Sequence, residues 1–188
     1  MRFLLALFFI VGLVSCNNDV VIKPKAQLRL DYTKANYTNF KTDCEYSFQK
    51  NERAILEKKR NCGLNLHYPK MKATLYLTYQ KVNDSNLDSL LRDAQKLTYD
   101  HAIKAESIPE QPFVNPNNNV YGMFYMINGD AATQAQFYAT DSVKHFINGA
   151  LYFEVKPNFD SIYPAVVYLR NDIRKIMETL EWNQINSK

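Results

Sequence analysis

The sequence predicts a single α+β domain in which an antiparallel sheet of about six strands packs against two long helices. Segments with apolar residues at every second position, typical of half-buried strands, lie on both sides of a segment with a helical apolar repeat. A second helical repeat closes the chain. Because short turns separate most of the strands, we expect neighbouring strands to pair antiparallel.

The first strands are predicted in the N-terminal half of the domain. Residues 44–48 alternate apolar and polar positions, and a charged connection at 50–60 follows them. The alternation returns at 64–68 and, after a Pro-Lys turn, at 71–79. These last two segments predict the clearest hairpin of the chain.

Two helices are predicted from stripes of apolar residues at helical spacing. The first runs over residues 87–105, with Ser85 and Asp88 spaced as in a capping box. The second covers residues 162–180, where Ser161 is the predicted N-cap. Both stripes indicate helices that place one face on the core.

Three further strands are predicted between the helices, at residues 121–128, 134–140 and 145–155. The proline-rich segment 108–119 before them cannot continue the first helix, and we interpret it as a surface connection that can include a short edge strand. Gly149 interrupts the last strand, which indicates a bulge or a close backbone approach. This order of strands and helices resembles the PsbP/Mog1-like fold.

The N-terminus has the layout of an export signal. Arg2 precedes twelve apolar residues, and the run ends in a small residue followed by Cys16. At about 1.5 Å per residue the run reaches about 18 Å, too short for a hydrocarbon core of about 30 Å. The final LVSC resembles a bacterial lipobox, so we predict a signal peptide at 1–15 and lipidation of Cys16. The alternative is an ordinary secretory signal with a chance cysteine.

The predicted domain boundaries follow from this N-terminus. Residues 16–40 are polar without sustained periodicity, and we interpret them as a lipidated N-terminus and tether. An alternative is that part of this arm docks on the domain. Residues 41–188 are the predicted α+β domain.

The cysteines form an even pair once Cys16 is lipidated, because only Cys44 and Cys62 remain. Export places these two in a compartment where disulfides persist, so we predict a bridge between them. Closing the loop would stabilise the fold by about 3 kcal/mol through the lost entropy of the unfolded chain. The alternative is two buried, reduced thiols.

The composition argues against nucleic acid as a partner. The formal net charge is +4, and the charged residues are interspersed rather than gathered in a basic block. The sequence carries no helix-turn-helix or RNA-binding signature. We therefore expect no nucleic-acid partner.

Candidate catalytic and metal-binding residues are sparse. His67, His101 and His145 are far apart, and none lies in a spacing typical of metal ligands. Asp141 and Ser142 closely precede His145, but no nucleophile-elbow motif surrounds the serine. A turn in which Asp141 or Ser142 bonds the backbone is the favoured interpretation. The sequence therefore predicts no catalytic residue, no metal and no cofactor.

A tripeptide of aspartate, serine and an apolar residue recurs three times, with its serine at Ser89, Ser142 and Ser161. Each copy is similar to the sites of general protein O-glycosylation in exported proteins of Bacteroidota. Helix capping and turn formation use the same residue types, and they are the alternative that the residues favour.

Longer strings of residues identify a family. They are CEYSF at 44–48, NLHYPKMKATLYLTY at 65–79, LTYDHAIKA at 97–105, QFYATDSVKHFINGALYF at 136–153 and METLEW at the end of the last predicted helix. Together with the lipobox they closely resemble the gliding-motility lipoprotein family GldD of Bacteroidota. The resemblance implies a non-enzymatic envelope lipoprotein of the gliding machinery linked to type IX secretion, with other envelope lipoproteins and complex components as partners. It assigns a defined role only to Cys16.

The residues after the lipidation site bear on location. Bacteroidota lipoproteins exported to the surface commonly carry an acidic run there, whereas this chain has only Asp19. This predicts anchoring on the periplasmic face of the outer membrane. The alternative function is a small-ligand-binding or hydrolytic periplasmic domain. That function would need a deep pocket with convergent polar groups, such as His145 beside Asp130.

Overall fold

The computed structural model of the protein describes residues 32–183, except 42, 101–102 and 157. The predicted signal segment at 1–15, the lipidation site Cys16 and the histidine His101 lie outside the described residues. Within the described part, the chain forms an α+β body in which two α-helices flank a large antiparallel sheet.

The main sheet has seven strands, and each neighbouring pair is antiparallel. In spatial order the strands are β3 (Ile55–Lys58), β4 (Leu64–Tyr68), β5 (Ala73–Lys81), β11 (His145–Phe153), β10 (Thr133–Thr140), β8 (Val120–Met126) and β7 (Glu110–Asn115). The pairing of β5 with β11 joins the early hairpin to the late one. This pairing extends from Ala73 opposite Phe153 to Lys81 opposite His145.

The remaining elements lie around this sheet. A three-stranded sheet has the order β1 (Tyr37–Lys41), β2 (Tyr46–Asn51) and β12 (Glu181–Trp182), and a two-stranded sheet pairs β6 (Ala105–Ser107) with β9 (Asn128–Gly129). The helices are α2 (Leu87–Asp100) and α3 (Phe159–Glu178), and short 3-10 turns occur at η1 (Arg60–Cys62), η2 (Pro69–Met71) and η3 (Pro116–Asn118).

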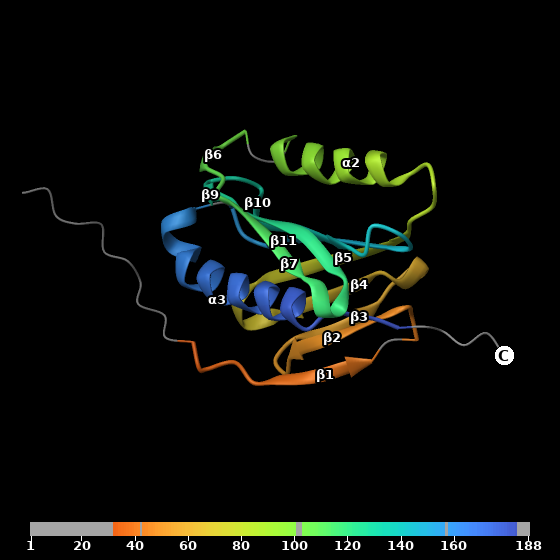
Figure 1. The fold of residues 1–188 in the computed structure, drawn as a ribbon. Coiled ribbons are helices and arrows are strands. Elements are labelled where there is room, and N and C mark those ends of the chain that lie inside the picture. The colour runs from red at the N-terminus through yellow and green to blue at the C-terminus, as the bar shows by residue number, and fades with distance from the viewer. Residues whose placement is uncertain (1–31, 42, 101–102, 157, 184–188) are drawn as a thin grey trace, which may run out of the picture.

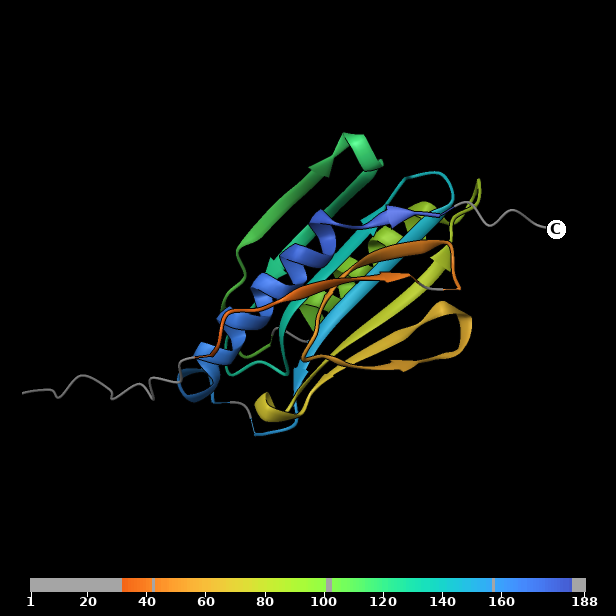
Figure 2. The ribbon, with the colours of Figure 1, turned by 90° about the horizontal axis from the view of Figure 1, so that it is seen from below.

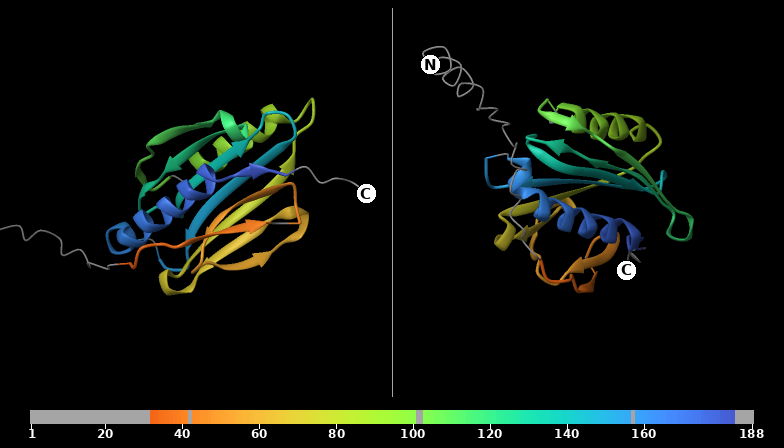
Figure 3. Two further views of the ribbon diagram at one scale, coloured as in Figure 1. Left: turned by 60° about the horizontal axis from the view of Figure 1, so that its bottom comes forward. Right: turned by 90° about the vertical axis from the view of Figure 1, so that its left-hand side faces the viewer.

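The elements form three layers. Helix α2 covers one face of the main sheet, while α3 and the strands β1 and β2 lie on the opposite face (Figure 1). Seen from below, α3 and the small sheet lie side by side beneath the main sheet (Figure 2). The same layering is visible from two further directions in Figure 3. The main sheet is therefore covered on both faces, as its strongly apolar central strands require.

The larger core lies between the main sheet and the layer of α3 and the small sheet. Its fully buried members include Tyr46, Leu66, Leu75, Phe137, Leu151, Leu169, Ile173 and Ile176. Gly149 belongs to this face, and a Cβ at that position would lie 2.1 Å from the ring of Phe137. The predicted close approach at Gly149 is therefore confirmed, with an aromatic ring as the group that requires the glycine.

The second face of the main sheet is only partly covered. Leu90 and Ala94 of α2 pack on Phe146 of β11. Toward β3, β4 and β5 the face stays accessible, and there Ile55 and Tyr76 are exposed. We call this region, formed by Ile55, Glu57, Asn65, His67, Thr74 and Tyr76, the open face.

A buried carboxylate joins α3 to the small sheet. Asp172 accepts hydrogen bonds from the Tyr37 hydroxyl at 2.7 Å and from the Asn51 side-chain amide at 2.8 Å. Burial raises the pKa of Asp172, although the hydrogen bonds from Tyr37 and Asn51 oppose that shift. Removing any one of these partners would leave buried polar atoms unpaired.

The disulfide between Cys44 and Cys62 is confirmed, with its Cα atoms 5.8 Å apart. If the two cysteines began neighbouring strands, the bridge would fix the edge of a single sheet. Instead Cys44 precedes β2 of the small sheet and Cys62 ends the turn before β4 of the main sheet. The Tyr46 hydroxyl adds a second link, because it donates to the Cys62 carbonyl at 2.7 Å. The bridge therefore connects two sheets.

Several boundaries differ from the predictions because pairing with a neighbouring strand completes segments whose own alternation is weak. The charged connection at 50–60 contains strand β3, the segment 108–119 contains strand β7, and the main sheet has seven strands rather than six. Strand β1 begins inside the range 16–40 and ends at Lys41, and it pairs with β2. The resemblance to the PsbP/Mog1-like fold stays a prediction.

The helix ends also required correction. Helix α2 ends before Ala105, which belongs to β6 instead. Ser85 bonds the side chain of Asn83 rather than capping α2. The N-cap of α3 is Asn158, whose side chain accepts from the Ser161 amide. In α3 an asparagine therefore performs the role that the sequence pattern gave to a serine.

Candidate functional site

A solvent-open pocket of about 480 Å³ lies at one end of the main sheet. Three segments far apart in the chain form it: the η3 turn, the turn between β10 and β11, and the strand β12 with the residue after it. Its lining residues are Asn117, Asn118, Asn119, Asp141, Val143, Lys144, His145, Glu181, Trp182 and Asn183. Amide, carboxylate, imidazole and indole groups thus face one space.

The turn between β10 and β11 positions the central histidine. One oxygen of Asp141, Oδ1, accepts from the backbone amides of Val143 at 3.0 Å, Lys144 at 2.8 Å and His145 at 2.8 Å. Ser142 has a positive φ of 65°, which such a tight turn requires. The turn therefore fixes His145 at the first position of β11.

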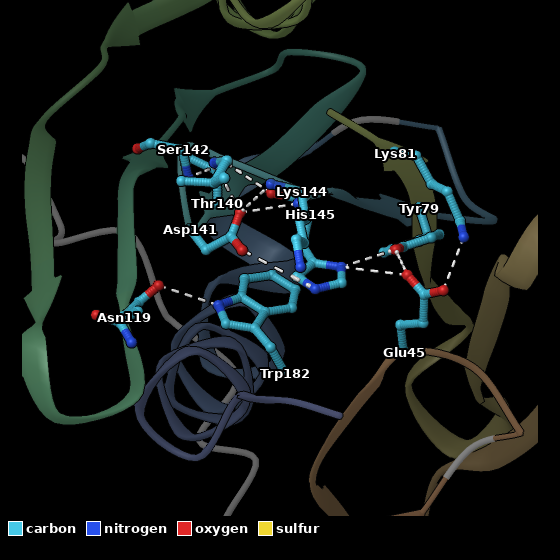
Figure 4. A network of polar contacts seen from close by, with 11 residues as sticks. Glu45, Tyr79, Lys81, Asn119, Thr140, Asp141, Ser142, Lys144, His145 and Trp182 are labelled. Carbon is cyan, nitrogen blue, oxygen red and sulfur yellow. Dashed lines mark hydrogen bonds and ion pairs between the residues drawn. The ribbon is translucent and has the colours of Figure 1, made fainter. Parts of the chain in front are cut away.

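A chain of hydrogen bonds leads from the surface to the His145 ring (Figure 4). Lys81 donates to Glu45 at 2.7 Å, and the Tyr79 hydroxyl donates to the other oxygen of Glu45 at 2.9 Å. Tyr79 Oη also lies 2.8 Å from His145 Nδ1. Because the single proton of Tyr79 goes to a carboxylate, which only accepts, we assign the Nδ1 proton to His145. The neutral ring then carries its lone pair on Nε2.

Burial and hydrogen bonding together set the protonation of this cluster. The pKa of His145 is lowered by burial, which outweighs the opposing charges of Asp141 and Glu45. Burial acts to raise the pKa of Asp141, but the three backbone hydrogen bonds outweigh it and the pKa is lowered. The pKa of Glu45 is lowered by the hydrogen bonds from Lys81 and Tyr79. At neutral pH the site therefore holds two carboxylates and a neutral imidazole.

Trp182 covers the imidazole. The two rings stack with their centroids 5.0 Å apart and an interplanar angle of 12°. The indole Nε1 donates to the carbonyl of Asn119 at 3.0 Å, and Asn118 donates to the Leu180 carbonyl at 3.1 Å. These bonds tie the β12 segment to the η3 turn, which holds the indole in the pocket wall.

Two neighbouring atoms of the pocket wall make no hydrogen bond with the described residues. They are His145 Nε2 and Asp141 Oδ2, and they lie 3.9 Å apart. Both accept hydrogen bonds, given the tautomer assigned above and the ionised carboxylate. A ligand that fills this position must therefore offer two donors.

The triad that the spacing of Asp141, Ser142 and His145 could suggest, and that we did not favour, is not assembled among the described residues. Asp141 bonds the backbone of its own turn, as the favoured interpretation stated, and no hydrogen bond joins Ser142 to His145 within the part of the chain described. Asp130 does not accompany His145 in the pocket, because it accepts from the backbone amide of Phe159 at the start of α3.

The three predicted glycosylation serines are all exposed. Ser89 donates its hydroxyl to the Asn86 carbonyl, and Ser161 donates to the Asn158 carbonyl, each at 2.8 Å. The hydroxyl of Ser142 has no such bond among the described residues. Modification of these serines stays a prediction.

Sequence reasoning missed the residues that surround His145. Glu45 was interpreted only as a polar position in a strand, and Trp182 was assigned to the end of a helix, whereas it lies in strand β12. The presence of a single tryptophan in 188 residues was the available signal. Its distance in the chain from His145 concealed their contact.

Two further searches of the described residues were negative. They include no group of three or more His, Cys, Asp or Glu side chains arranged to hold a metal ion. No helix among them combines the length and apolar character that crossing a bilayer requires.

Comparisons with known proteins address the identity of the chain. A search of curated proteins gave no match. The family model described as "Gliding motility lipoprotein GldD" matches residues 17–182, a range that covers most of the chain and includes both His145 and Trp182. The protein therefore belongs to the gliding motility lipoprotein GldD family.

Proposed function

We propose that the protein is a lipid-anchored envelope component that acts without catalysis, by binding other proteins of the gliding machinery and of the linked type IX secretion system. Membership of the GldD family is the observation that carries this proposal. The family description supplies gliding motility and lipoprotein character, and the mode of action is our inference.

The proposed anchor is lipid on Cys16 after removal of residues 1–15. Stable anchoring needs more than one acyl chain, which lipoprotein maturation supplies. Residues 17–19, directly after the anchor, contain one acidic residue, Asp19, rather than an acidic run. This supports a location on the periplasmic face of the outer membrane. Strand β1 begins at Tyr37, so any free tether ends before that residue.

The surface of the domain exposes side chains that are suited to protein contacts. The exposed large hydrophobic side chains include Tyr76, Tyr99, Tyr121 and Tyr163. The first three belong to the side of the main sheet that carries α2. Tyrosine is enriched in protein interfaces, because it supplies apolar area together with a polar hydroxyl. We propose this side as the contact surface.

Crosslinking in intact cells followed by purification of the native lipoprotein tests the proposal. We expect envelope proteins to co-purify, and we expect a Tyr76→Ser/Tyr121→Ser double variant to lose them. Tyr163→Ser, on α3 at the opposite face, is the matched control and should retain them. A clean monomer after crosslinking of the wild type would contradict the assembly role.

Location is tested separately by adding protease to intact cells. The proposal expects protection until the outer membrane is permeabilised. Cys16→Ser should release the protein from the membrane fraction with its fold intact. Digestion in intact cells would overturn the periplasmic assignment.

A further inference from the structure

The pocket beside Trp182 has a donor and acceptor pattern that the assembly role does not explain. His145 Nε2 and Asp141 Oδ2 are both acceptors, and their separation of 3.9 Å exceeds a hydrogen bond. The side chains of both residues are largely buried, with 9% and 14% exposed. Both atoms belong to the pocket lining and accept hydrogen bonds, so the space between them suits a ligand that donates two protons.

We propose that this pocket binds a neutral saccharide and holds two adjacent hydroxyl groups of one sugar ring. One hydroxyl donates to His145 Nε2 and its neighbour donates to Asp141 Oδ2. A vicinal diol matches two acceptors at this spacing, because each hydroxyl carries one proton. The inference goes beyond the proposed assembly function and does not depend on it.

The other walls of the pocket fit the same ligand. Trp182 supplies an aromatic surface for the apolar face of a sugar ring. The side-chain amides of Asn117 and Asn119 make no hydrogen bond with the described residues, and each can both donate and accept. A pocket of about 480 Å³ lies within the usual size range for small-molecule sites.

The charges of the wall argue against an ionic ligand. Asp141 and Glu181 are negative, Lys144 is positive, and the histidine is neutral by the assignment above. The carboxylates disfavour a phosphate or carboxylate ligand, and Lys144 disfavours an ammonium ion. A neutral molecule with several hydroxyls avoids both penalties.

The single tryptophan makes binding directly measurable. Trp182 is the only tryptophan of the chain, so tryptophan emission of the full-length protein, excited beyond the tyrosine absorption band, reports on this pocket. The probes are N-acetylglucosamine, its linear trisaccharide, trans-1,2-cyclohexanediol as a minimal diol, and cyclohexanol as a matched ring with one hydroxyl. We expect saturable changes with the first three and none with cyclohexanol. Tighter binding of the trisaccharide than of the monosaccharide would assign the site to a glycan chain, and equal binding would assign it to a free sugar.

A substitution sharpens the test without removing the turn. In Asp141→Asn the side-chain oxygen can still accept the three backbone amides, while an NH₂ donor replaces the acceptor Oδ2 in the pocket. We expect affinity for the saccharides to fall by about tenfold or more, because a hydrogen bond to a charged acceptor is lost. Asp130→Asn is the matched control, since Asp130 also accepts a backbone amide but lies outside the pocket.

The outcomes are separable. Saturable binding of the diol and not of cyclohexanol, lost in Asp141→Asn and retained in Asp130→Asn, supports the proposal. Equal responses to diol and cyclohexanol, or binding of n-butylammonium in place of the saccharides, would overturn it. If Asp141→Asn fails to fold, the comparison of diol with cyclohexanol on the wild-type chain still decides the question.

Discussion

Two histidines of this protein lie beside carboxylates, and their surroundings differ. His67 sits on the open face, with its side chain 33% exposed, and its two ring nitrogens contact Glu57 at 3.1 Å and Thr74 at 3.0 Å. His145 sits in the pocket wall, with its side chain 9% exposed, and its Nε2 is 3.9 Å from Asp141. The exposed ring has partners on both sides, whereas the enclosed ring has one side open to a ligand.

The two histidine regions show separately how direct pairing and burial shift the pKa of a side chain. On the open face, the hydrogen bond from Lys59, followed by those from His67 and Asn65, lowers the pKa of Glu57 to about 2. In the pocket, burial outweighs two nearby carboxylates and lowers the pKa of His145. Water completes the partners of an exposed pair, but a buried pair depends on the protein or a ligand.

The largest expected effect comes from the bridge between the two regions. The disulfide ties the start of β2, next to Glu45, to the start of β4, which carries His67. Replacing Cys44 and Cys62 by alanine should lower the free energy of unfolding by about 3 kcal/mol. Urea unfolding of the variant and of the wild type measures the difference. An unchanged midpoint would show that the link between the sheets contributes nothing.

The next effect comes from a tyrosine pair on opposite faces of β5. Tyr79→Phe removes the hydroxyl between Glu45 and His145 and should cost about 2 kcal/mol, because buried polar atoms lose their partner. Tyr76→Phe, on the open face, should change stability by less than about 0.5 kcal/mol. Chemical denaturation of both variants checks the contrast. Equal effects would remove the distinction between the two regions.

A smaller effect is expected from acid. Because the pKa of His145 is lowered in the folded state, the unfolded chain binds more protons just below the ordinary value of about 6.5. The free energy of unfolding therefore falls as the pH drops through that window, by at most about 1.4 kcal/mol per pH unit for one proton. The pKa values of Asp141 and Glu45 are also lowered in the folded state. Protonation of these carboxylates therefore also lowers the free energy of unfolding, but only near pH 4, where unfolded carboxyl groups titrate.

Stability measured between pH 7.5 and pH 5 tests this assignment. His145→Gln should make the free energy of unfolding depend less on pH across this range. His67→Gln should leave the contribution of His145 to that dependence unchanged. A wild-type stability that rises on acidification in this range would have the wrong sign.

The smallest energetic effect concerns modification at the surface. Ser142 is the one predicted glycosylation site whose hydroxyl makes no hydrogen bond with the described residues, whereas Ser89 and Ser161 donate to helix-start carbonyls. We expect added hexose mass on the Ser142 peptide of native material, with little change in stability. An unmodified Ser142 peptide would end the hypothesis for this site.

Local patterns predicted much of the fold. Strand β4 occupies the predicted residues 64–68, and β5, β10, β11 and both helices lie within a few residues of their predicted ranges. These elements show clear periodicity because they bury one continuous face. Strands β1, β3 and β12 are short, and pairing completes them: β1 and β3 pair with the next strand of the chain, and β12 pairs with the distant β2. Their sequences therefore carry little signal of their own.

The candidate site was less predictable than the fold. Asp141 and His145 could be placed on one turn from their spacing, and the two cysteines could be paired from their number. The contacts of the His145 ring need Glu45 before β2, Tyr79 of β5 and Trp182 of β12 to converge, and no local pattern encodes that convergence. Trp182 illustrates the difficulty. It lies only four residues after the end of α3, yet it belongs to strand β12 and contacts His145.

The state of the His145 ring tests the central claim most directly. Long-range ¹H–¹⁵N correlation spectra of the full-length protein at pH 7 distinguish the two neutral tautomers and the charged form. We expect a proton on Nδ1, a bare Nε2 facing the pocket and a titration midpoint below the ordinary value. A proton on Nε2, or a charged ring at pH 7, would contradict both the hydrogen-bond assignment and the acceptor pair proposed to hold a sugar.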